Sequence, residues 1–298
     1  MHQKWNSKDL IIIKENHNKK TLPQIYKMLS KNDISYSGFR AKCQRMGLFR
    51  GEGLKLPNKN TFDLEYWKKP TLMNAYLAGF IAADGSLFID KSNNHCFSVK
   101  VSVKDEHIID LFKKELKYSG PKKYINHKSP NSNNISKCVY ITLFSFNKNF
   151  EYLKNHYNLT PLKTKRIGPI NLKEKDLILS YLIGSIDGDG TIAMRTTKQN
   201  GREYPSPYLH ICSASKKFVD WFKEKMDEYY PPLTKRNPKV AKVEKDNLYR
   251  WTVGGLRAAI IINSMRKINV PKFKRKWENP KVLEYADQKK KEFPKLFL

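Results

Sequence analysis

The sequence predicts an α+β fold in which two similar units follow a small all-α head. A helical segment that ends in Asp-Gly occurs twice, within 76–90 and 181–195. Each copy is followed by the same order of predicted elements, which marks an internal repeat of about 100 residues. Residues 1–50 show only the apolar spacing of short helices.

The composition indicates a polyanionic partner. The 298 residues include 57 Lys and Arg against 28 Asp and Glu, which gives a formal net charge of +29. Such an excess repels itself in the folded chain unless a partner neutralises it, and nucleic acid is the simplest candidate. An acidic membrane surface fits less well, because no long amphipathic basic helix is evident. A hydrophobic content of 40% implies a folded core, which argues against a cationic membrane-active peptide.

Cysteine spacing and the absence of long apolar runs predict a soluble, intracellular protein. The four cysteines are scattered and none forms a Cys-x-x-Cys pair, so neither a zinc site nor a disulfide framework is expected. The N-terminus has no apolar signal core. No segment approaches the roughly 18 apolar residues of a membrane span.

The head, 1–50, is predicted to contain three short helices. The first covers 6–17 and the third covers 35–47. The second starts at Thr21, a helix-capping residue, and Pro23 falls in its first turn. The order of three short helices is typical of small DNA-binding units.

The third predicted helix carries three candidates for DNA contact, Arg40, Lys42 and Gln44. A three-helix unit with a basic last helix resembles a helix-turn-helix domain, whose third helix enters the major groove. The alternative is a helical hairpin that only packs against the next domain. The large positive charge of the chain favours DNA binding.

The remainder of the chain is predicted to be a linker and two repeats. Residues 51–70 mix Gly, Pro, Asn and charged side chains, as linkers do. The repeats are expected at 71–168 and at 169–298, the second with a basic C-terminal tail. Each is expected to run from a helix through two strands, a charged helix, further β-like runs and another helix to a basic segment with proline. The matching pieces are 87–89 with 191–194, 97–103 with 208–213, 105–116 with 215–228, and 139–146 with 248–253.

Small residues precede each aspartate on one face of its predicted helix. Side chains at i and i+4 share a face, and small ones let two helix backbones approach closely. Packing the two repeats helix against helix would therefore bring Asp84 and Asp189 together. The small residues are Gly79 and Ala83 in the first copy, and Gly184 and Gly188 in the second.

Two carboxylates at neighbouring helix C-termini are unfavourable without a ligand. Each faces the negative end of a helix dipole, and the two repel each other. A divalent metal removes both penalties, and oxygen ligands without nearby His or Cys favour Mg²⁺, for which Mn²⁺ is expected to substitute. A metal held in this way can activate water and stabilise the leaving oxygen of a phosphodiester. The alternative for either Asp-Gly pair alone is simple helix termination in a turn, which the duplication disfavours.

At these residues the chain resembles the LAGLIDADG homing endonucleases in their single-chain, two-motif form. LAGFIAADG matches the family motif at seven of nine positions, with Phe80 and Ala82 as the exceptions. LIGSIDGDG keeps both acids, Asp187 and Asp189, and differs at three positions. The resemblance covers 70–280 and does not include the head.

The resemblance implies a fold and an activity. The fold is two pseudo-symmetric αββαββα repeats whose antiparallel strands form a DNA-binding saddle. The activity is site-specific, metal-dependent hydrolysis of both DNA strands across the minor groove, leaving 3′ overhangs. Such proteins are intron-encoded, so the compartment would be the cytoplasm, or the organelle or phage-infected cell that carries the intron.

The resemblance also implies the roles of individual residues. Asp84 and Asp189 would hold the metal together with the backbone carbonyls of Ala83 and Gly188. Asp187 would be structural or a helix cap, so Ala82 at the equivalent position does not imply an inactive site. One lysine per repeat would assist at the scissile phosphates: Lys163 in the first and, in preference to Lys272 or Lys276, Lys274 in the second.

Alternating residues on the predicted strands add candidates for DNA contact. Apolar and polar side chains alternate along 97–103, which predicts a strand with one core face and one polar face. Lys and Arg on such a face can contact phosphates or guanines. The candidates on the strands of both repeats are Ser98, Lys100, Ser102, Arg195, Thr197, Lys198, His210, Arg250 and Thr252.

The partner is therefore expected to be double-stranded DNA, bound by a monomer at a long asymmetric site. Two alternatives stay open: an RNA-binding intron maturase, for which host intron RNA would be a further partner, and a non-cleaving DNA-binding regulator. The retained Asp84 and Asp189 argue against the second. An endonuclease that also represses transcription through its head is a further possibility.

Overall fold

The chain forms two compact units, Met1–Lys59 and Asn60–Leu298. The computed structural model describes residues 5–17, 20, 22–29, 34–48, 60–128, 135–199, 201–235 and 237–297. Thr21, the predicted start of the second helix, lies outside the described residues, as does the part 51–59 of the predicted linker. Among the described residues, no helix has the length and apolar composition needed to cross a bilayer.

Among its described residues, the first unit has three short helices, α1 (Ser7–Asn16), α2 (Leu22–Lys27) and α3 (Tyr36–Arg45). The Asn6 side chain caps α1 by accepting a hydrogen bond from the Asp9 N–H, and Ser35 caps α3 in the same way. The three helices enclose a small core of their own, made by Ile13, Ile25, Leu29, Ile34, Phe39 and Cys43.

The second unit contains two repeats with the same αββαββα order of elements, so the predicted fold class is confirmed. The first repeat consists of α4 (Leu72–Asp84), β1 (Gly85–Ile89), β2 (His95–Ser102), α5 (Glu106–Glu115), β3 (Lys123–Lys128), β4 (Ile135–Leu143) and α6 (Asn147–Tyr157). The second consists of α7 (Lys175–Asp189), β5 (Gly190–Gln199), β6 (Arg202–Ser213), α8 (Lys216–Tyr229), β7 (Ala241–Val243), β8 (Leu248–Gly254) and α9 (Gly255–Arg266), followed by α10 (Lys274–Trp277) and α11 (Pro280–Glu292).

Each repeat builds one four-stranded antiparallel sheet, and the two sheets share one topology. The strand orders are β1-β2-β4-β3 and β5-β6-β8-β7. In β2, the residues Phe97, Val99 and Val101 are buried while Ser98, Lys100 and Ser102 are not. Because successive side chains leave a strand on opposite sides, one face of the sheet lies on the core and the other is open.

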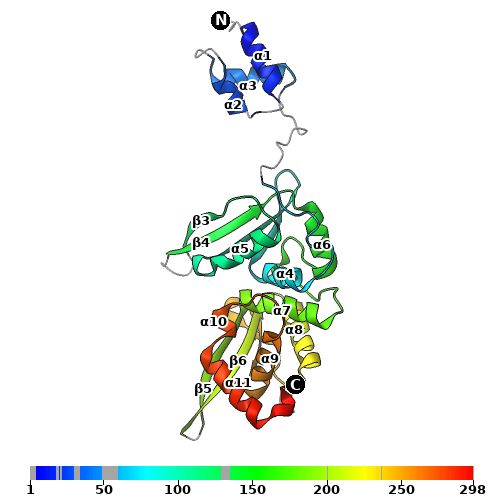
Figure 1. Cartoon of the computed structure of the whole chain (residues 1–298), viewed down its shortest axis with the longest axis vertical. Helices are drawn as coiled ribbons and strands as arrows, with labels where there is room; N and C mark the ends of the chain where they lie inside the picture. The colour runs from blue at the N-terminus through cyan, green and yellow to red at the C-terminus, as the bar shows by residue number, and fades with distance from the viewer. Residues whose placement is uncertain are drawn as a thin grey trace. The chain divides into compact units, whose positions relative to one another are not determined.

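The two central helices, α4 and α7, pack side by side between the repeats (Figure 1). A Cβ added to Gly79 would lie 1.9 Å from the Tyr181 carbonyl oxygen, and one added to Gly184 would lie 2.0 Å from the Tyr76 carbonyl oxygen. Neither position can carry a side chain at this separation, so the predicted close approach of the two motif helices is confirmed. The approach is reciprocal, as expected of related repeats.

Residues 60–70 were expected to belong to a linker, and the structure corrects this. Trp67 is fully buried in the core of the second unit, and its indole N–H donates to the Asn74 carbonyl. Backbone hydrogen bonds join Asp63 to Leu116 and Ser119 to Thr61. The polar composition of the segment masked the large side chains that pack it against the first repeat, which are Trp67 and, partly buried, Phe62 and Tyr66.

Candidate active site

The two motif aspartates end the two central helices at the same end of the pair. Asp84 is the last residue of α4 and Asp189 the last of α7, and each is followed by a glycine that begins a strand. A Cβ added to Gly188 would lie 2.3 Å from the Ala83 Cβ and 3.4 Å from Asp84 Oδ2. The helices therefore touch one residue before the acids, and the structure brings both carboxylates together.

The surroundings of the pair disfavour negative charge. Desolvation by neighbouring atoms raises the pKa of Asp189 to about 6, and the charge of Asp84 adds to this effect. Desolvation also raises the pKa of Asp84, against the opposing charges of Lys276 and Lys163. Both side chains still keep exposed surface. The two carboxyl groups are therefore harder to ionise than usual, and their exposed surface leaves room for a cation to bind.

One buried lysine stands beside the end of each central helix. Lys163 Nζ donates to the carbonyls of Ala82 and Ala83 at 2.6 and 3.3 Å, at the end of α4. Lys276 Nζ lies 2.7 to 3.3 Å from four carbonyl oxygens, three at the end of α7 and one at the start of β5, which its three N–H groups share; they belong to Ile186, Asp187, Gly188 and Gly190. Burial lowers the pKa of each lysine to about 8, while the nearby carboxylates oppose that change. The two contacts are equivalent, because Ala82 and Ala83 match Asp187 and Gly188 in the repeat.

Lys276, and not Lys274, is therefore the counterpart of Lys163. Lys274 was preferred from sequence, but it is exposed and begins α10, while Lys276 is only 6% exposed. The physical reason lies in the loop before α10. Lys163 follows Pro161 by two residues, whereas Lys276 follows Pro271 by five, so alignment on the prolines selects the wrong position.

The oxygen atoms at this point suit a hard divalent cation. Two carboxylates converge there, and the carbonyls of Ala83 and Gly188, the other expected ligands, each accept a long 3.3 Å hydrogen bond from a lysine. Among the residues that the structure describes, no group of three or more His, Cys, Asp or Glu side chains could hold a metal. A metal here would depend on the two carboxylates, backbone oxygens and water.

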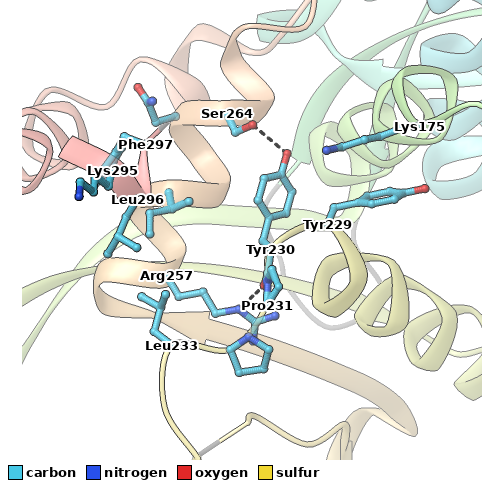
Figure 2. A pocket seen from close by; sticks show the side chains of 13 residues that line it. Lys175, Tyr229, Tyr230, Pro231, Leu233, Arg257, Ser264, Lys295, Leu296 and Phe297 are labelled. Carbon is cyan, nitrogen blue, oxygen red and sulfur yellow. Dashed lines mark hydrogen bonds between the residues drawn. The ribbon is translucent and has the colours of Figure 1, made fainter. Parts of the chain in front are cut away.

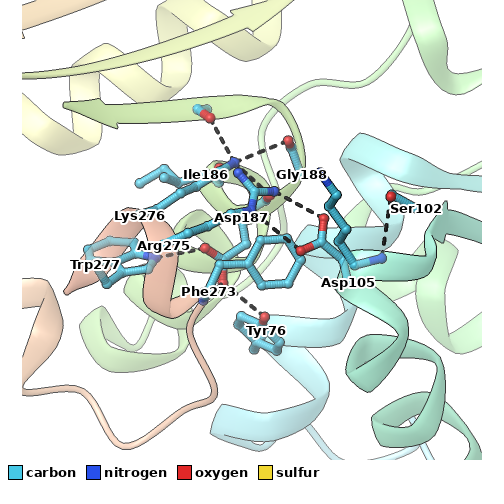
Figure 3. Close-up of polar contacts among 12 residues, drawn as sticks. Tyr76, Ser102, Asp105, Ile186, Asp187, Gly188, Phe273, Arg275, Lys276 and Trp277 are labelled. Carbon is cyan, nitrogen blue, oxygen red and sulfur yellow. Dashed lines mark hydrogen bonds and ion pairs between the residues drawn. The ribbon is translucent and has the colours of Figure 1, made fainter. Parts of the chain in front are cut away.

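Asp187 lies in the interface of the helices and not at a helix cap (Figure 3). Its Oδ2 accepts from the Tyr76 hydroxyl at 2.9 Å and from the Phe273 N–H at 3.1 Å, and its Oδ1 accepts from the Trp277 indole at 2.7 Å. Burial raises the pKa of Asp187 to about 6 in spite of these hydrogen bonds. The sequence predicted a structural or capping role for Asp187 but gave no sign of these partners, all three of which lie more than 80 residues away.

The candidates of the first repeat, Ser98, Lys100 and Ser102, lie together on the open face of its sheet. Lys100 is exposed. The Ser98 hydroxyl donates to the Ile141 carbonyl at 2.9 Å, and Ser102 accepts from the Lys104 N–H at 3.4 Å. Lys100 is thus the member of this group with the most accessible side chain.

Most candidates of the second repeat share one open face, but Lys198 does not. Strand pairing aligns Thr191, His210 and Thr252 across three strands, and Arg250 and Thr252 share a face of β8. Arg195 and Thr197 lie on the same face of β5 as Thr191, because an even number of positions separates them. Lys198 lies on the opposite face, with the core residues, and forms an ion pair with Glu203 at 3.1 Å. Adjacent strand residues point to opposite sides, so Thr197 and Lys198 cannot both belong to the open face. His210 has a lowered pKa, because of burial and then of the charges of Arg250 and Lys276.

The candidates of the head lie on two sides of α3. Arg40 and Gln44 are one helical turn apart and exposed. Lys42 lies on another side, half-buried, with its ammonium 6.0 Å from the centre of the Trp5 ring. Arg40 and Gln44 could therefore reach one surface together, whereas Lys42 helps to cover Trp5.

A cavity of about 450 Å³ in the second repeat has a different character (Figure 2). Aromatic and aliphatic side chains surround it, with Lys175 above the Tyr229 ring at 5.2 Å. No carboxylate of the described residues lines this cavity, and Arg257 is held by hydrogen bonds to Asp227 and to backbone carbonyls. The chemistry expected of paired acids is absent from it.

The chain is similar to known proteins in structure but not in sequence. No protein-family model matches it, and no curated protein matches it. It is similar to the meganuclease I-SmaMI bound to uncleavable DNA, with 16% identity and a TM-score of 0.48, over 74% of this chain and 90% of that one. It is also similar to the LAGLIDADG meganuclease I-CpaMI bound to uncleaved DNA, with 12% identity and a TM-score of 0.49, over 73% and 92%. A third similar structure is the LAGLIDADG homing endonuclease I-LtrWI bound to target DNA, with 13% identity and a TM-score of 0.45, over 77% and 92%.

Proposed function

We propose that this protein is a site-specific endonuclease that hydrolyses both strands of double-stranded DNA with the help of Mg²⁺. The observation that carries the proposal is the pairing of Asp84 and Asp189 at the ends of the two packed central helices, with one buried lysine beside each helix end. Two equivalent half-sites suit a substrate with two equivalent strands.

Asp84 and Asp189 are proposed to hold the metal, with the carbonyls of Ala83 and Gly188. When bound, a divalent cation supplies an activated water and stabilises the leaving oxygen of a phosphodiester. The protein's own residues do the rest. Lys163 and Lys276 place positive charge near the scissile phosphates, where charge develops in the transition state.

The open faces of the two sheets are proposed to contact the DNA. Lys100 in the first repeat and Arg195 and Arg250 in the second are exposed cations on these faces. Contacts of cations with phosphates position a protein on DNA, and contacts with base edges confer specificity. Because the two repeats differ at equivalent positions, the target is expected to be asymmetric and a monomer to suffice. Cleavage across the minor groove with 3′ overhangs is what the resemblance of the motifs implies.

Cleavage of a randomised DNA library tests the proposal. The whole protein is incubated with the library and Mg²⁺, and then with Mn²⁺, and the cut ends are sequenced. We expect double-strand cuts at one long asymmetric sequence, with a fixed stagger between strands. Enrichment of a bound sequence without cutting in either metal would instead identify a DNA-binding regulator.

A further inference from the structure

The buried carboxylate of Asp187 joins three parts of the chain. It is 1% exposed and accepts hydrogen bonds from Tyr76 on α4 and from Phe273 and Trp277 in the C-terminal part of the chain (Figure 3). A buried carboxylate with three donors is favourable only while all of them stay in place. Asp187 therefore links both central helices to the segment 271–277.

The segment 271–277 carries Lys276 and contains only one short helix. Helix α10 has four residues, too few to be stable without tertiary contacts. Two residues anchored to Asp187, Phe273 and Trp277, flank Lys276 on both sides. The Phe273 ring packs edge-on against Phe80 of α4, with 5.8 Å between ring centroids. The position of the Lys276 ammonium at the end of α7 thus depends on these anchors.

The first repeat lacks the equivalent carboxylate. Ala82 stands at the position of Asp187, and Tyr181 stands at the position of Tyr76. The Tyr181 hydroxyl is buried and has no hydrogen-bond partner among the residues that the structure describes. The segment that carries Lys163 is held differently, by the Ser215 hydroxyl, which donates to the Ile167 carbonyl at 2.5 Å.

We propose that Asp187 is a positioning residue of the second half-site, which fastens 271–277 to the central helices and so places Lys276 at the end of α7. The proposal rests on the proposed function, because it assumes that the position of Lys276 matters for cleavage. Lys276 binds the end of α7 and Lys163 binds the end of α4, so each lysine belongs to one half-site, although both carboxylates act on each lysine. Loss of the anchor therefore affects one DNA strand and spares the other.

The test is Asp187→Asn in the full-length protein. The carboxamide keeps the shape of the side chain but has only one acceptor oxygen. Its NH₂ group must therefore replace either the oxygen that accepts from Trp277 or the oxygen that accepts from Tyr76 and Phe273. Cleavage is followed on the library-selected target, labelled on each strand, at saturating protein and Mg²⁺. We expect the rate constant for one strand to fall by about 10- to 100-fold, as for other groups that orient a site. The other strand should be cut at the wild-type rate, so nicked DNA accumulates, and DNA affinity should be unchanged.

Ser185→Ala is the matched control. Ser185 is also buried on α7, and its hydroxyl contacts the Gly79 and Tyr181 carbonyls but not the segment 271–277. A merely structural effect lowers the fraction of active protein, which reduces the amplitude of cleavage on both strands alike. The control should therefore leave the ratio of the two strand rates at its wild-type value.

Backbone hydrogen exchange separates this proposal from the proposed function. In Asp187→Asn, exchange within 271–277 should become faster, whereas in Ser185→Ala it should not. Unchanged exchange in that segment, or equal rate losses on both strands, overturns the proposal. If the wild type cuts neither strand, the proposed function fails, and the anchor is judged by exchange alone. If Asp187→Asn does not fold, Trp277→Phe takes its place, because it removes the donor to Asp187 Oδ1. The same strand rates and the same exchange within 271–277 are then measured, and the same results support or overturn the proposal.

Discussion

At the residue scale, four buried or crowded charges balance one another at the ends of two helices. Asp84 and Asp189 occupy positions where the helix dipole and mutual repulsion disfavour an anion. Lys163 and Lys276 bind the carbonyls of the same helix ends and offset part of that cost. The balance is incomplete, since the pKa of Asp189 is still raised to about 6. A divalent cation would complete it.

The raised pKa predicts how metal affinity depends on pH. A metal binds the ionised carboxylate, and with a pKa of about 6 the proton competes with the metal below that pH. Mg²⁺ affinity should fall as the pH drops below about 7, approaching ten-fold per pH unit below about 6. Titration calorimetry at several pH values measures this. Asp189→Asn should abolish the pH dependence near 6, and an affinity that stays constant down to pH 5 would refute the assignment.

Two equivalent tyrosines should respond oppositely to removal of the hydroxyl. Tyr76→Phe leaves Asp187 without one of its donors and should lower the free energy of unfolding by about 1 to 3 kcal/mol. Tyr181→Phe removes a buried hydroxyl without a partner among the described residues and should be neutral or stabilising by about 1 kcal/mol. Urea denaturation of both variants measures the difference. Equal destabilisation by the two changes would show that the hydroxyls have equivalent environments.

At the element scale, the close packing of α4 and α7 is the feature that places the site. It follows from the small residues of the motif, and this is why the sequence alone predicted it: spacing on one helix face is a local pattern. The choice of lysine was not local, because Lys272, Lys274 and Lys276 alternate and the groups that hold Lys276 inward lie on α7, more than 80 residues away. The edge strands β3 and β7 were not located from sequence, since their residues are mostly exposed and show no apolar alternation.

Gly184→Ala should disrupt the helix pair. The new Cβ would lie 2.0 Å from the Tyr76 carbonyl oxygen, a backbone atom that cannot move alone. We expect a loss of about 3 kcal/mol or more in the free energy of unfolding, at the upper end for overpacked cores. Gly168→Ala is the control, because its Cβ would meet nothing closer than 3.8 Å. Calorimetric or urea unfolding compares them, and a Gly184 variant as stable as the control would contradict the close approach.

At the scale of the whole molecule, two related sheets present different chemistry at equivalent places. Pairing with the first strand of each sheet makes Ser98 of the first repeat equivalent to His210 of the second. Their partners on the third strand are Thr142 and Thr252. One half thus offers a hydroxyl where the other offers an imidazole, which supports an asymmetric target. The net charge of +29 is shared by both units and supports an extended interface with phosphates.

Removal of the head should weaken binding without removing the chemistry. The site lies entirely in Asn60–Leu298, which forms a compact unit with its own core. Deletion of 1–59 should reduce DNA affinity and make it less sensitive to salt. The slope of the logarithm of the binding constant against the logarithm of the salt concentration should become shallower by about 0.9 for each phosphate that the head neutralises in the full-length protein. Fluorescence anisotropy between low and moderate salt measures both. Complete loss of cleavage at saturating truncated protein would show that the head is needed for the chemistry as well as for binding.

We propose that Asp84 and Asp189 together make one metal-dependent site. It is tested most directly by single-turnover cleavage of the selected DNA target by Asp84→Asn and Asp189→Asn, with DNA affinity measured alongside. Each variant keeps the shape of the side chain and loses the charge that the metal requires. Each should bind the target with nearly wild-type affinity and cut neither strand detectably in Mg²⁺. Cleavage of both strands by both single variants would show that the site lies elsewhere.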